Sequence, residues 1–327
     1  MPATFSRRAA LALAGLSLPG LARAQGFPQR NVTIIVPSAP GGTLDALARF
    51  YAQAMTPPLG RQVVVENVSG AGGLIGMQRA ARSDPDGHTI SFGNMGVMAV
   101  GSILNPQGGF DPRRDMAPIS LVADVPMVLS ASPRGSIRTL PALLEKLRAE
   151  GEKVTFGTAG LGTTSHLAPG YLLFLAKAKG TLVSYRGAGP ALNDLAAGLV
   201  DAVIDQTVTM IPGHRGGTAV ALAVSAPQRI AQLPDVPTFA EGGLPGFDLV
   251  IWNGFAAPSG TPAPILAKLA EAVEAAQADP GLQGRLRDLA STATAPAARG
   301  PEAMKARIAA DMTKWTEVIN SPDFARE

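Results

Sequence analysis

The segment VTIIVPSAPGGTLD, residues Val32–Asp45, carries the clearest fold signal of the chain. It begins with a β-branched run that is typical of a buried strand and passes through the turn residues of Ser38–Thr43. It then enters a segment in which apolar residues recur at helical spacing. A strand, a glycine turn and a helix in this order open a βαβ unit, in which a helix joins two parallel strands. The sequence therefore predicts an α/β protein, with Thr43 as the N-cap of the first helix.

A second stretch repeats this order further along the chain. Val154–Phe156 is typical of a strand, Thr158–Ser165 is rich in glycine and threonine, and Leu167–Lys177 has helical spacing. The other predicted strands and helices are Gln62–Glu66, Thr89–Phe92, Leu121–Ala131 with an interruption at Pro126, Leu140–Glu150, Thr181–Tyr185, Pro190–Ala197, Val200–Ile204, Ala219–Ser225, Leu249–Ala257 and a helix from Pro301 with the apolar stripe Met304, Ile308, Met312, Trp315 and Ile319. The alternation predicts two α/β units built on mostly parallel strands.

Length and composition exclude several classes of protein. The 327 residues are 46% hydrophobic and 16% charged, which suits two domains with a large buried core and excludes disorder. Aromatic residues make up 5%, which argues against a platform for stacking single-stranded nucleic acid. The chain has no cysteine and three histidines. Disulfides and cysteine metal sites are therefore excluded, and we expect neither a metal nor a cofactor.

Residues 1–24 are typical of an export signal. Arg7 and Arg8 precede the apolar stretch Ala9–Leu18, and Ala22–Ala24 gives a small-residue cleavage site. The paired arginines resemble a twin-arginine signal, which exports folded proteins, although the residues after them also fit the ordinary secretory route. The signal holds three arginines and no acid, so 25 of the 28 basic residues remain against 25 acidic ones. The mature chain is neutral and has no electrostatic footprint for nucleic acid.

The two glycine loops, Ser38–Thr43 and Thr158–Ser165, predict one binding site. Ligands of open α/β sheets lie beyond the carboxyl ends of the strands, where each of these loops leads into a helix. Helix N-termini offer free main-chain N–H groups and a partial positive charge, and glycines allow close approach. Two such loops facing each other across a cleft would hold a carboxylate without any arginine. Either loop alone also fits a plain turn with a helix cap.

Nucleotide and hydrolase motifs do not fit. The chain lacks the G-x-x-x-x-G-K-S/T phosphate loop, and Gly70–Gly76 misses the dinucleotide-binding spacing by one residue. A G-x-S-x-G turn is absent as well, and His166 would be the only base near a glycine loop. We therefore expect a protein that is not an enzyme, with an exported hydrolase as the less favoured alternative.

At these residues the chain resembles the substrate-binding receptors of the tripartite tricarboxylate transporter family, also called Bug proteins. The segments that carry the resemblance are Phe27–Arg30, Val36–Asp45, Val64–Asn67 with Gly70–Gly73, Asp84–Thr89, Gly160–Ala168, Tyr185–Gly187, Leu233–Thr238 and Ala257–Pro262. The resemblance implies a periplasmic protein with the two-domain Venus-flytrap fold of type 2-like periplasmic binding proteins, each domain a mostly parallel sheet flanked by helices. We expect domain 1 at residues 25–124 plus 249–327, and domain 2 at residues 125–248.

The resemblance also implies which residues bind the solute, a small organic acid or amino acid. Main-chain donors are expected at Ser38, Ala39, Gly41 and Gly42 of the first domain, facing Thr158, Ala159, Gly162, Thr163 and Thr164 of the second. Thr43 and Thr164 are candidates both for solute contacts and for helix caps. Asp45 is expected to organise the first loop, accept from a ligand ammonium group or interact with the helix dipole, and Asp205 to fix loops or contact the ligand.

Three positions depart from the family pattern and leave the identity of the solute open. They are Ala39 for a proline, Gln206 for an asparagine and Arg186 for a lysine.

The implied partners are integral membrane transporter subunits, and we expect a monomer. A receptor that reports its liganded state to a membrane signalling protein is the alternative function. Trp252 is expected to pack in the hinge or the core.

Overall fold

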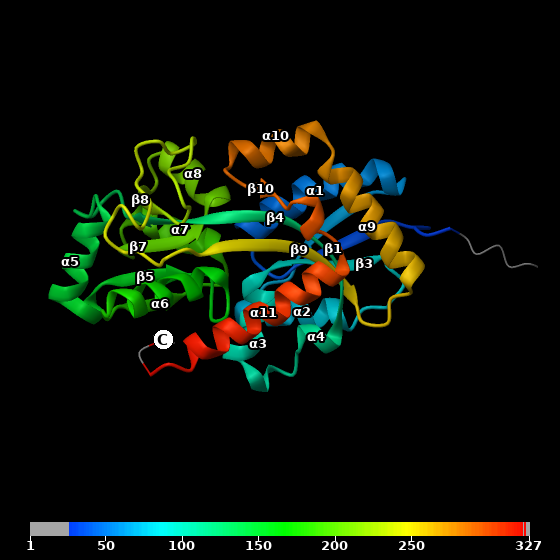
Figure 1. Cartoon of the computed structure of the whole chain (residues 1–327), viewed down its shortest axis with the longest axis horizontal. Coiled ribbons are helices and arrows are strands. Elements are labelled where there is room, and N and C mark those ends of the chain that lie inside the picture. Colours follow the sequence, from blue (N-terminus) through cyan, green and yellow to red (C-terminus); the bar gives the residue numbers. More distant parts are fainter. Residues whose placement is uncertain (1–25, 323, 325–327) are drawn as a thin grey trace, which may run out of the picture.

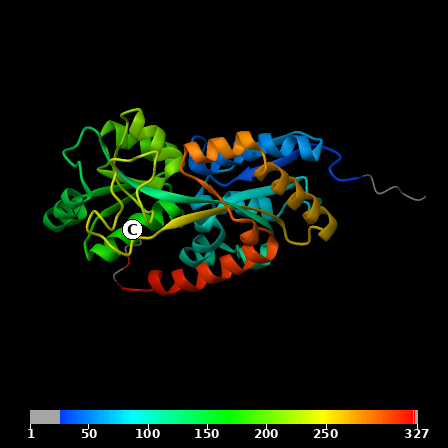
Figure 2. The same cartoon turned by 45° about the horizontal axis from the view of Figure 1, so that its top comes forward.

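The computed structural model describes residues 26–322 and residue 324. The predicted export signal, residues 1–24, lies outside the described residues. The chain forms two lobes side by side, joined by two long strands that run through both (Figure 1). A rotated view shows the same division, with the C-terminal helix along one side (Figure 2). Among the described residues, none of the helices combines the length and the apolar character that a membrane span requires.

The first lobe is built on a sheet in the order β2-β1-β3-β9-β4. β1 is parallel to β2 and β3, whereas β9 is antiparallel to both β3 and β4. The strands of this sheet are β1 (Val32–Val36), β2 (Val63–Asn67), β3 (Thr89–Asn94), β9 (Val250–Pro258), β4 (Met116–Ala131) and the short β10 (Thr292–Ala293), which pairs with β4.

The second lobe continues from β4 in the order β4-β7-β5-β6, with β8 also paired to β4. Its parallel part consists of β5 (Thr155–Thr158) between β6 (Thr181–Ser184) and β7 (Ala202–Gln206). β4 runs antiparallel to β7 and to β8 (Val220–Val224). The parallel strands in both lobes are the ones that the sequence pattern indicates, and the antiparallel partners are the strands that pass between the lobes.

β4 is one continuous strand, so the predicted interruption at Pro126 is wrong. β4 pairs with β9 as far as Pro126, which lies opposite Val250, and with β7 from Met127 onward. Proline has no N–H to donate, and here it lies where the strand exchanges one partner for another. The expected domain boundaries at 124/125 and 248/249 lie close to this crossing and remain a prediction.

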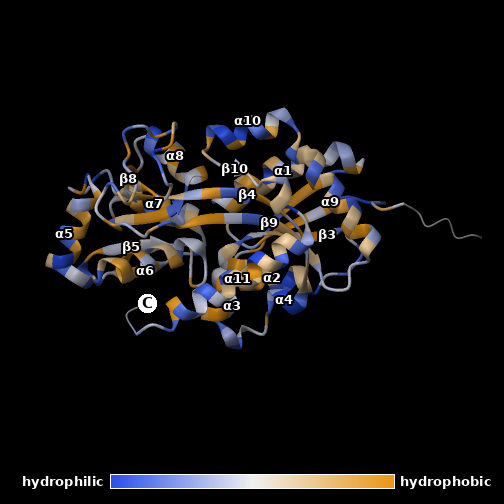
Figure 3. Cartoon of the chain, viewed as in Figure 1, coloured by the Kyte–Doolittle hydropathy of each residue, from blue (hydrophilic) through white to orange (hydrophobic). Residues whose placement is uncertain are grey.

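The helices cover both sheets (Figure 1). They are α1 (Thr43–Leu59), α2 (Leu74–Ala81), α3 (Gly101–Leu104), α4 (Pro112–Asp115), α5 (Leu140–Glu150), α6 (Thr164–Ala176), α7 (Ala188–Ala197), α8 (Thr207–Arg215), α9 (Ala263–Gln277), α10 (Pro280–Asp288) and α11 (Pro301–Ile319), with the π-helical turn η2 (Gly96–Val100) before α3. Hydropathy follows this arrangement: β4 is largely hydrophobic and α10 is mostly hydrophilic (Figure 3).

The C-terminal helix α11 adds a polar contact that the sequence pattern did not reveal. Most of its predicted stripe is buried, but Met312 is only half-buried. Asp311 beside it is buried and accepts from the indole nitrogen of Trp252 at 2.5 Å. Trp252 is fully buried, which confirms its predicted place in the packed interior. The pair anchors α11 to β9 because a buried indole N–H requires an acceptor.

Candidate functional site

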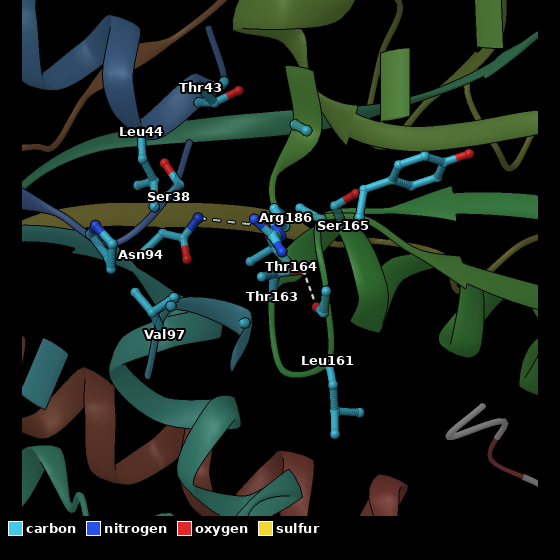
Figure 4. Close-up of a pocket in the computed structure, with 18 of the residues that line it drawn as sticks. Ser38, Thr43, Leu44, Asn94, Val97, Leu161, Thr163, Thr164, Ser165 and Arg186 are labelled. Carbon is cyan, nitrogen blue, oxygen red and sulfur yellow. Dashed lines mark hydrogen bonds between the residues drawn. The ribbon is translucent and has the colours of Figure 1, made fainter. Parts of the chain in front are cut away.

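A cavity of about 360 Å³ lies between the two lobes. Three strand-to-helix loops line it: residues 37–44 after β1, residues 70–73 after β2, and residues 159–165 after β5. Figure 4 shows Ser38, Thr43 and Asn94 on one side and Thr163 to Ser165 on the other, with Arg186 between them. The cavity is therefore at the carboxyl ends of parallel strands, where open α/β sheets bind ligands.

The first loop has two hydroxyl groups that no residue within 26–322 or at 324 pairs with. The N-cap of α1 is Gly42, and Thr43 is the first helical residue, so the prediction that Thr43 caps this helix is wrong. Gly42 holds the extended conformation of the cap position, which places the Thr43 hydroxyl one residue too far along to accept from the first turn. Among the described residues, neither Thr43 Oγ1 nor Ser38 Oγ has a hydrogen-bond partner, although both are buried. Both residues line the cavity.

Asp45 braces the first loop from behind. Its carboxylate accepts from the Gly41 N–H at 3.1 Å and from Arg49 Nε at 3.0 Å. Arg49 also donates to Asn67 Oδ1 at 3.2 Å, and Asn67 donates to the Ser38 carbonyl at 3.2 Å. Burial alone would raise the pKa of Asp45, but the hydrogen bonds from Arg49 and Gly41 lower it below its usual value. Asp45 does not line the cavity, and its contacts are those of a residue that organises the loop.

The main-chain donors of the first loop differ from the expectation at two positions. The Ser38 N–H donates to the Val36 carbonyl at 2.9 Å, and the Gly41 N–H is used by Asp45. Both amides are thus engaged within the chain. The amides of Thr43 and Leu44 lie in the first turn of α1 and have no intrahelical acceptor, and both residues line the cavity. The N–H groups that this loop offers to a ligand therefore belong to the first turn of α1 and not to the turn before it.

The second loop is capped by its own side chain. Thr163 is the N-cap of α6: its hydroxyl accepts from the His166 N–H at 3.2 Å and donates to the Gly160 carbonyl at 2.7 Å. Thr164 is the first helical residue, so its alternative role as a cap is wrong. Its hydroxyl instead lies 3.4 Å from Asn94 Nδ2 of the first lobe. Ser165 lines the cavity, and its buried hydroxyl has no partner among the described residues.

Not every predicted site residue reaches the cavity. Those that line it are Ser38, Gly42, Thr43, Ala159, Thr163, Thr164 and Asp205. Thr158 is buried behind the second loop, where its hydroxyl accepts from the Gly160 N–H at 3.4 Å. Ala39 and Gly162 lie at contacts between the lobes, against Gly187 and Gly101.

Asp205 and Gln206 form the inner polar end of the cavity. Both are almost fully buried at the end of β7. The Asp205 carboxylate accepts from Thr209 Oγ1 at 2.7 Å, and burial raises its pKa to about 6. Gln206 Oε1 accepts from Asn253 Nδ2 at 3.0 Å. The site therefore carries a buried acid whose charge is only partly compensated.

The cavity is also lined by residues outside the predicted binding set: Gly70–Gly73, Asn94, Ser165, Arg186 and Gln206. Arg186 and Gln206 were noted only as departures from the family pattern. Gly70–Gly73 was noted only as part of the family resemblance and as a failed dinucleotide motif, although its position after a strand and before a helix is the same signal as in the other two loops. Asn94 and Gln206 have no local signal because only the packing of the two lobes brings them to the cavity.

Glycines hold the two lobes in close contact around the cavity. A Cβ atom on Gly72 would lie 1.7 Å from the Leu161 carbonyl oxygen, and one on Gly96 would lie 2.6 Å from the Thr164 nitrogen. A Cβ atom on Gly187 would lie 2.9 Å from the Ala39 Cβ. Such distances are not tolerated between real atoms, so the main chains of the two lobes meet at positions that admit no side chain. The two lobes therefore approach each other closely beside the cavity.

The family follows from comparison with known proteins. A family model described as the tripartite tricarboxylate transporter family receptor matches residues 47–323. The chain belongs to this family. Protein BugT of Bordetella pertussis is 33% identical over 312 residues, which are 94% of this chain and 94% of BugT.

Solved structures show the same fold. The periplasmic binding protein BugD is 37% identical, with a TM-score of 0.85, over 90% of this chain and 97% of BugD. MatC from Rhodopseudomonas palustris with bound malate is 35% identical, with a TM-score of 0.86, over 90% of this chain and all of MatC. A second R. palustris protein, solved with adipate, is 30% identical, with a TM-score of 0.86, over 92% of this chain and 99% of that protein.

These likenesses confirm the predicted family and the type 2-like periplasmic-binding-protein fold. They also confirm the predicted role: the protein is a periplasmic solute-binding receptor of the tripartite tricarboxylate transporter family.

Proposed function

We propose that this receptor captures a small carboxylate-bearing solute in the cavity between the loop before α1 and the loop before α6, and delivers it to integral membrane transporter subunits. The observation that carries the proposal is the set of buried hydroxyl groups, on Ser38, Thr43 and Ser165, that have no partner among the described residues. Buried polar groups are normally hydrogen-bonded, so unpaired hydroxyl groups on residues of both lobes that line one cavity support a polar ligand there.

The charge of the expected ligand follows from the donors. Two helix N-termini, those of α1 and α6, present first-turn amides at the cavity. Arg186 is the one cationic side chain among the described residues that line it. A carboxylate that leaves water must be matched by several hydrogen bonds, and this set of donors supplies them. Relatives solved with malate and with adipate support an organic acid as the solute.

Calorimetry and thermal unfolding with a panel of acids test the proposal. The panel contains mono-, di- and tricarboxylates, amino acids and aromatic acids. A solute at a hundredfold excess over its Kd is expected to stabilise the protein by about 2.7 kcal/mol through linkage. Ser38→Asp is expected to abolish this shift, because it adds a negative charge inside the cavity, whereas Ser136→Asp on the exposed surface leaves it unchanged. A panel without any shift in the wild-type protein contradicts the proposal.

Two further expectations concern export and assembly. We propose export in the folded state through the paired arginines Arg7 and Arg8. Replacing both with lysine should block export by the twin-arginine route and leave export by the secretory route intact, so fractionation of the variant decides between them.

We also propose a monomeric receptor, for which light scattering of the mature protein should give the mass of one chain with and without solute.

A further inference from the structure

We propose that Gln206 is a specificity-determining residue of this cavity, and that Asn253 fixes its side-chain amide so that the nitrogen donates to an oxygen of the bound solute. The inference rests on the proposed function, because it requires a solute that carries an anionic oxygen. It assigns separate tasks to two buried amides: Gln206 touches the solute, and Asn253 positions Gln206.

The orientation of the Asn253 amide is set by its surroundings. Asn253 lies in β9 and is fully buried. Its Nδ2 atom is 3.2 Å from the Ile251 carbonyl oxygen and 3.5 Å from the Ala123 carbonyl oxygen. Main-chain carbonyls only accept hydrogen bonds, so the atom between them must be the nitrogen and not the oxygen of the amide.

This orientation determines the next one. The same Asn253 nitrogen is 3.0 Å from the side-chain amide of Gln206. Because that nitrogen is a donor, the Gln206 atom facing it must be the oxygen, and the Gln206 nitrogen must point the other way. Gln206 is 1% exposed and lines the cavity. In the described part of the chain no acceptor is paired with its Nε2 atom, so the two N–H groups are left for whatever occupies the cavity.

The chemistry of the inner end now discriminates between two groups of the same shape. Gln206 offers donors, and a carboxylate oxygen of the solute is a good acceptor for them. A primary amide in the same place has one oxygen and one NH₂ group. If the NH₂ group faces Gln206, two donors meet and the hydrogen bond is lost. If the oxygen faces Gln206, the NH₂ group points to the donors that the second carboxylate oxygen would have used. Asp205 beside it only accepts when ionised, and Arg186 lies at the exposed side of the cavity. Gln206 is therefore the neutral donor that favours a carboxylate over its amide at this end.

The test is the variant Gln206→Glu, which keeps the length and shape of the side chain. One oxygen of the new carboxylate still accepts from Asn253. The other takes the place of Gln206 Nε2, so an acceptor faces the cavity where a donor did before. Calorimetry compares malate, succinate and adipate with their monoamides on both proteins. The wild-type protein is expected to prefer the dicarboxylate, and the variant to lose at least about tenfold in affinity for it, as expected for a lost hydrogen bond to a charged group. The preference for carboxylate over amide should reverse.

A second variant, Asn253→Asp, separates positioning from contact. The new carboxylate accepts instead of donating, so the Gln206 amide should turn its nitrogen toward β9 and its oxygen toward the cavity. The carboxylate-to-amide preference should then shift as in Gln206→Glu, although no group that touches the solute has changed. A merely structural role for Asn253 would weaken both probes equally. If this variant does not fold, the preference in Gln206→Glu still decides the role of Gln206.

The outcomes distinguish this inference from the proposed function. Gln283→Glu adds the same charge on α10, outside the cavity, and is expected to keep the wild-type preference. A wild-type protein that binds dicarboxylates, together with a Gln206→Glu variant of unchanged preference, overturns the role of Gln206 alone. A wild-type protein that binds none of the acids overturns the proposed function as well.

Discussion

The loops before α1 and α6 have similar compositions but are stabilised by different contacts. The first is held by side chains that reach it from behind, through Asp45, Arg49 and Asn67. The second is held by its own cap, Thr163. The hydroxyl one residue later caps neither helix: that of Thr43 has no partner among the described residues, and that of Thr164 lies 3.4 Å from Asn94 Nδ2. The position of a hydroxyl relative to the helix start thus separates a structural threonine from an available one.

The two acids near these loops differ in the same way. Asp45 has Arg49 as a partner, and its hydrogen bonds lower its pKa despite burial. Asp205 is more deeply buried and accepts from Thr209, with no cation paired to it in the part of the chain that the structure describes, and burial raises its pKa to about 6. One acid stabilises the loop in its charged form, whereas the other lowers the free energy of unfolding when it is charged.

The largest expected effect sharpens this contrast between the acids. The pKa of Asp205 rises from 3.8 to about 6 on folding, so the folded protein takes up the proton before the unfolded chain does. The free energy of unfolding therefore increases as the pH falls from about 6 toward 3.8, and it decreases as the pH rises back through this range. The full cost above pH 6 is about 3 kcal/mol. Asp205→Asn is expected to raise the free energy of unfolding at pH 7.5 by up to this amount.

Urea unfolding from pH 4 to pH 7.5 measures the difference in stability between the wild-type protein and Asp205→Asn. The wild-type protein should approach the variant as the pH falls, because its Asp205 becomes neutral. Asp45→Asn is the matched control and should act in the opposite direction, since a lowered pKa stabilises the fold above pH 4. Equal curves for the wild-type protein and Asp205→Asn would mean that the fold compensates the buried charge.

A second variant disturbs the contact between η2 of the first lobe and the loop before α6. Gly96→Ala adds a Cβ atom whose three nearest neighbours all belong to the second lobe, the closest being the Thr164 nitrogen at 2.6 Å. Gly96 is helical, so alanine suits its backbone conformation, and the strain comes only from the neighbours in the second lobe. Overpacking of this kind costs about 1–3 kcal/mol, so solute affinity should fall by about ten- to hundredfold.

Gly284→Ala is the control for that variant. Gly284 is also helical, in α10, and an added Cβ atom there would have only Arg287 nearby, at 3.9 Å. We expect a small gain in stability and no change in affinity. If Gly96→Ala binds the solute like the wild-type protein in calorimetry, the lobes do not close as the structure has them.

The smallest effect tests the two threonines directly. Thr163→Val removes a helix cap and should lower stability by about 1 kcal/mol. Thr43→Val removes a hydroxyl that caps nothing, so stability should be unchanged while solute affinity falls severalfold. Thermal unfolding and calorimetry on both variants give the two readings. An equal loss of stability in both would break the distinction between the loops.

The sequence predicted the parts of the fold that depend on local pattern. The alternation of strands, glycine turns and helices was sufficient for the α/β class, and α5 and the start of α11 lie where the pattern places them. β4 was harder because proline at a change of strand partner resembles a strand end, and only the pairing with β9 and β7 shows that the strand continues.

The site was predictable only as far as the chain carries its signal locally. The glycine loops of Gly42 and Ala159 were found because turn residues between a strand and a helix are visible in the sequence. Thr43 was predicted as a site residue, but its main-chain donor and that of Leu44 were not, since locating them requires the residue at which α1 begins. Asn94 and Gln206 approach the cavity through long-range packing, and Asp45 reveals its bracing role only through Arg49 and Asn67.

The glycine contacts between the lobes have a consequence for transport. At Gly72 and Gly96 the main chain of one lobe meets the main chain of the other, so these contacts bury little apolar side-chain surface. We therefore expect the bound solute to supply most of the free energy that keeps the two lobes together. A receptor without solute is then expected to favour an open arrangement, so that closure itself reports that an acid is bound.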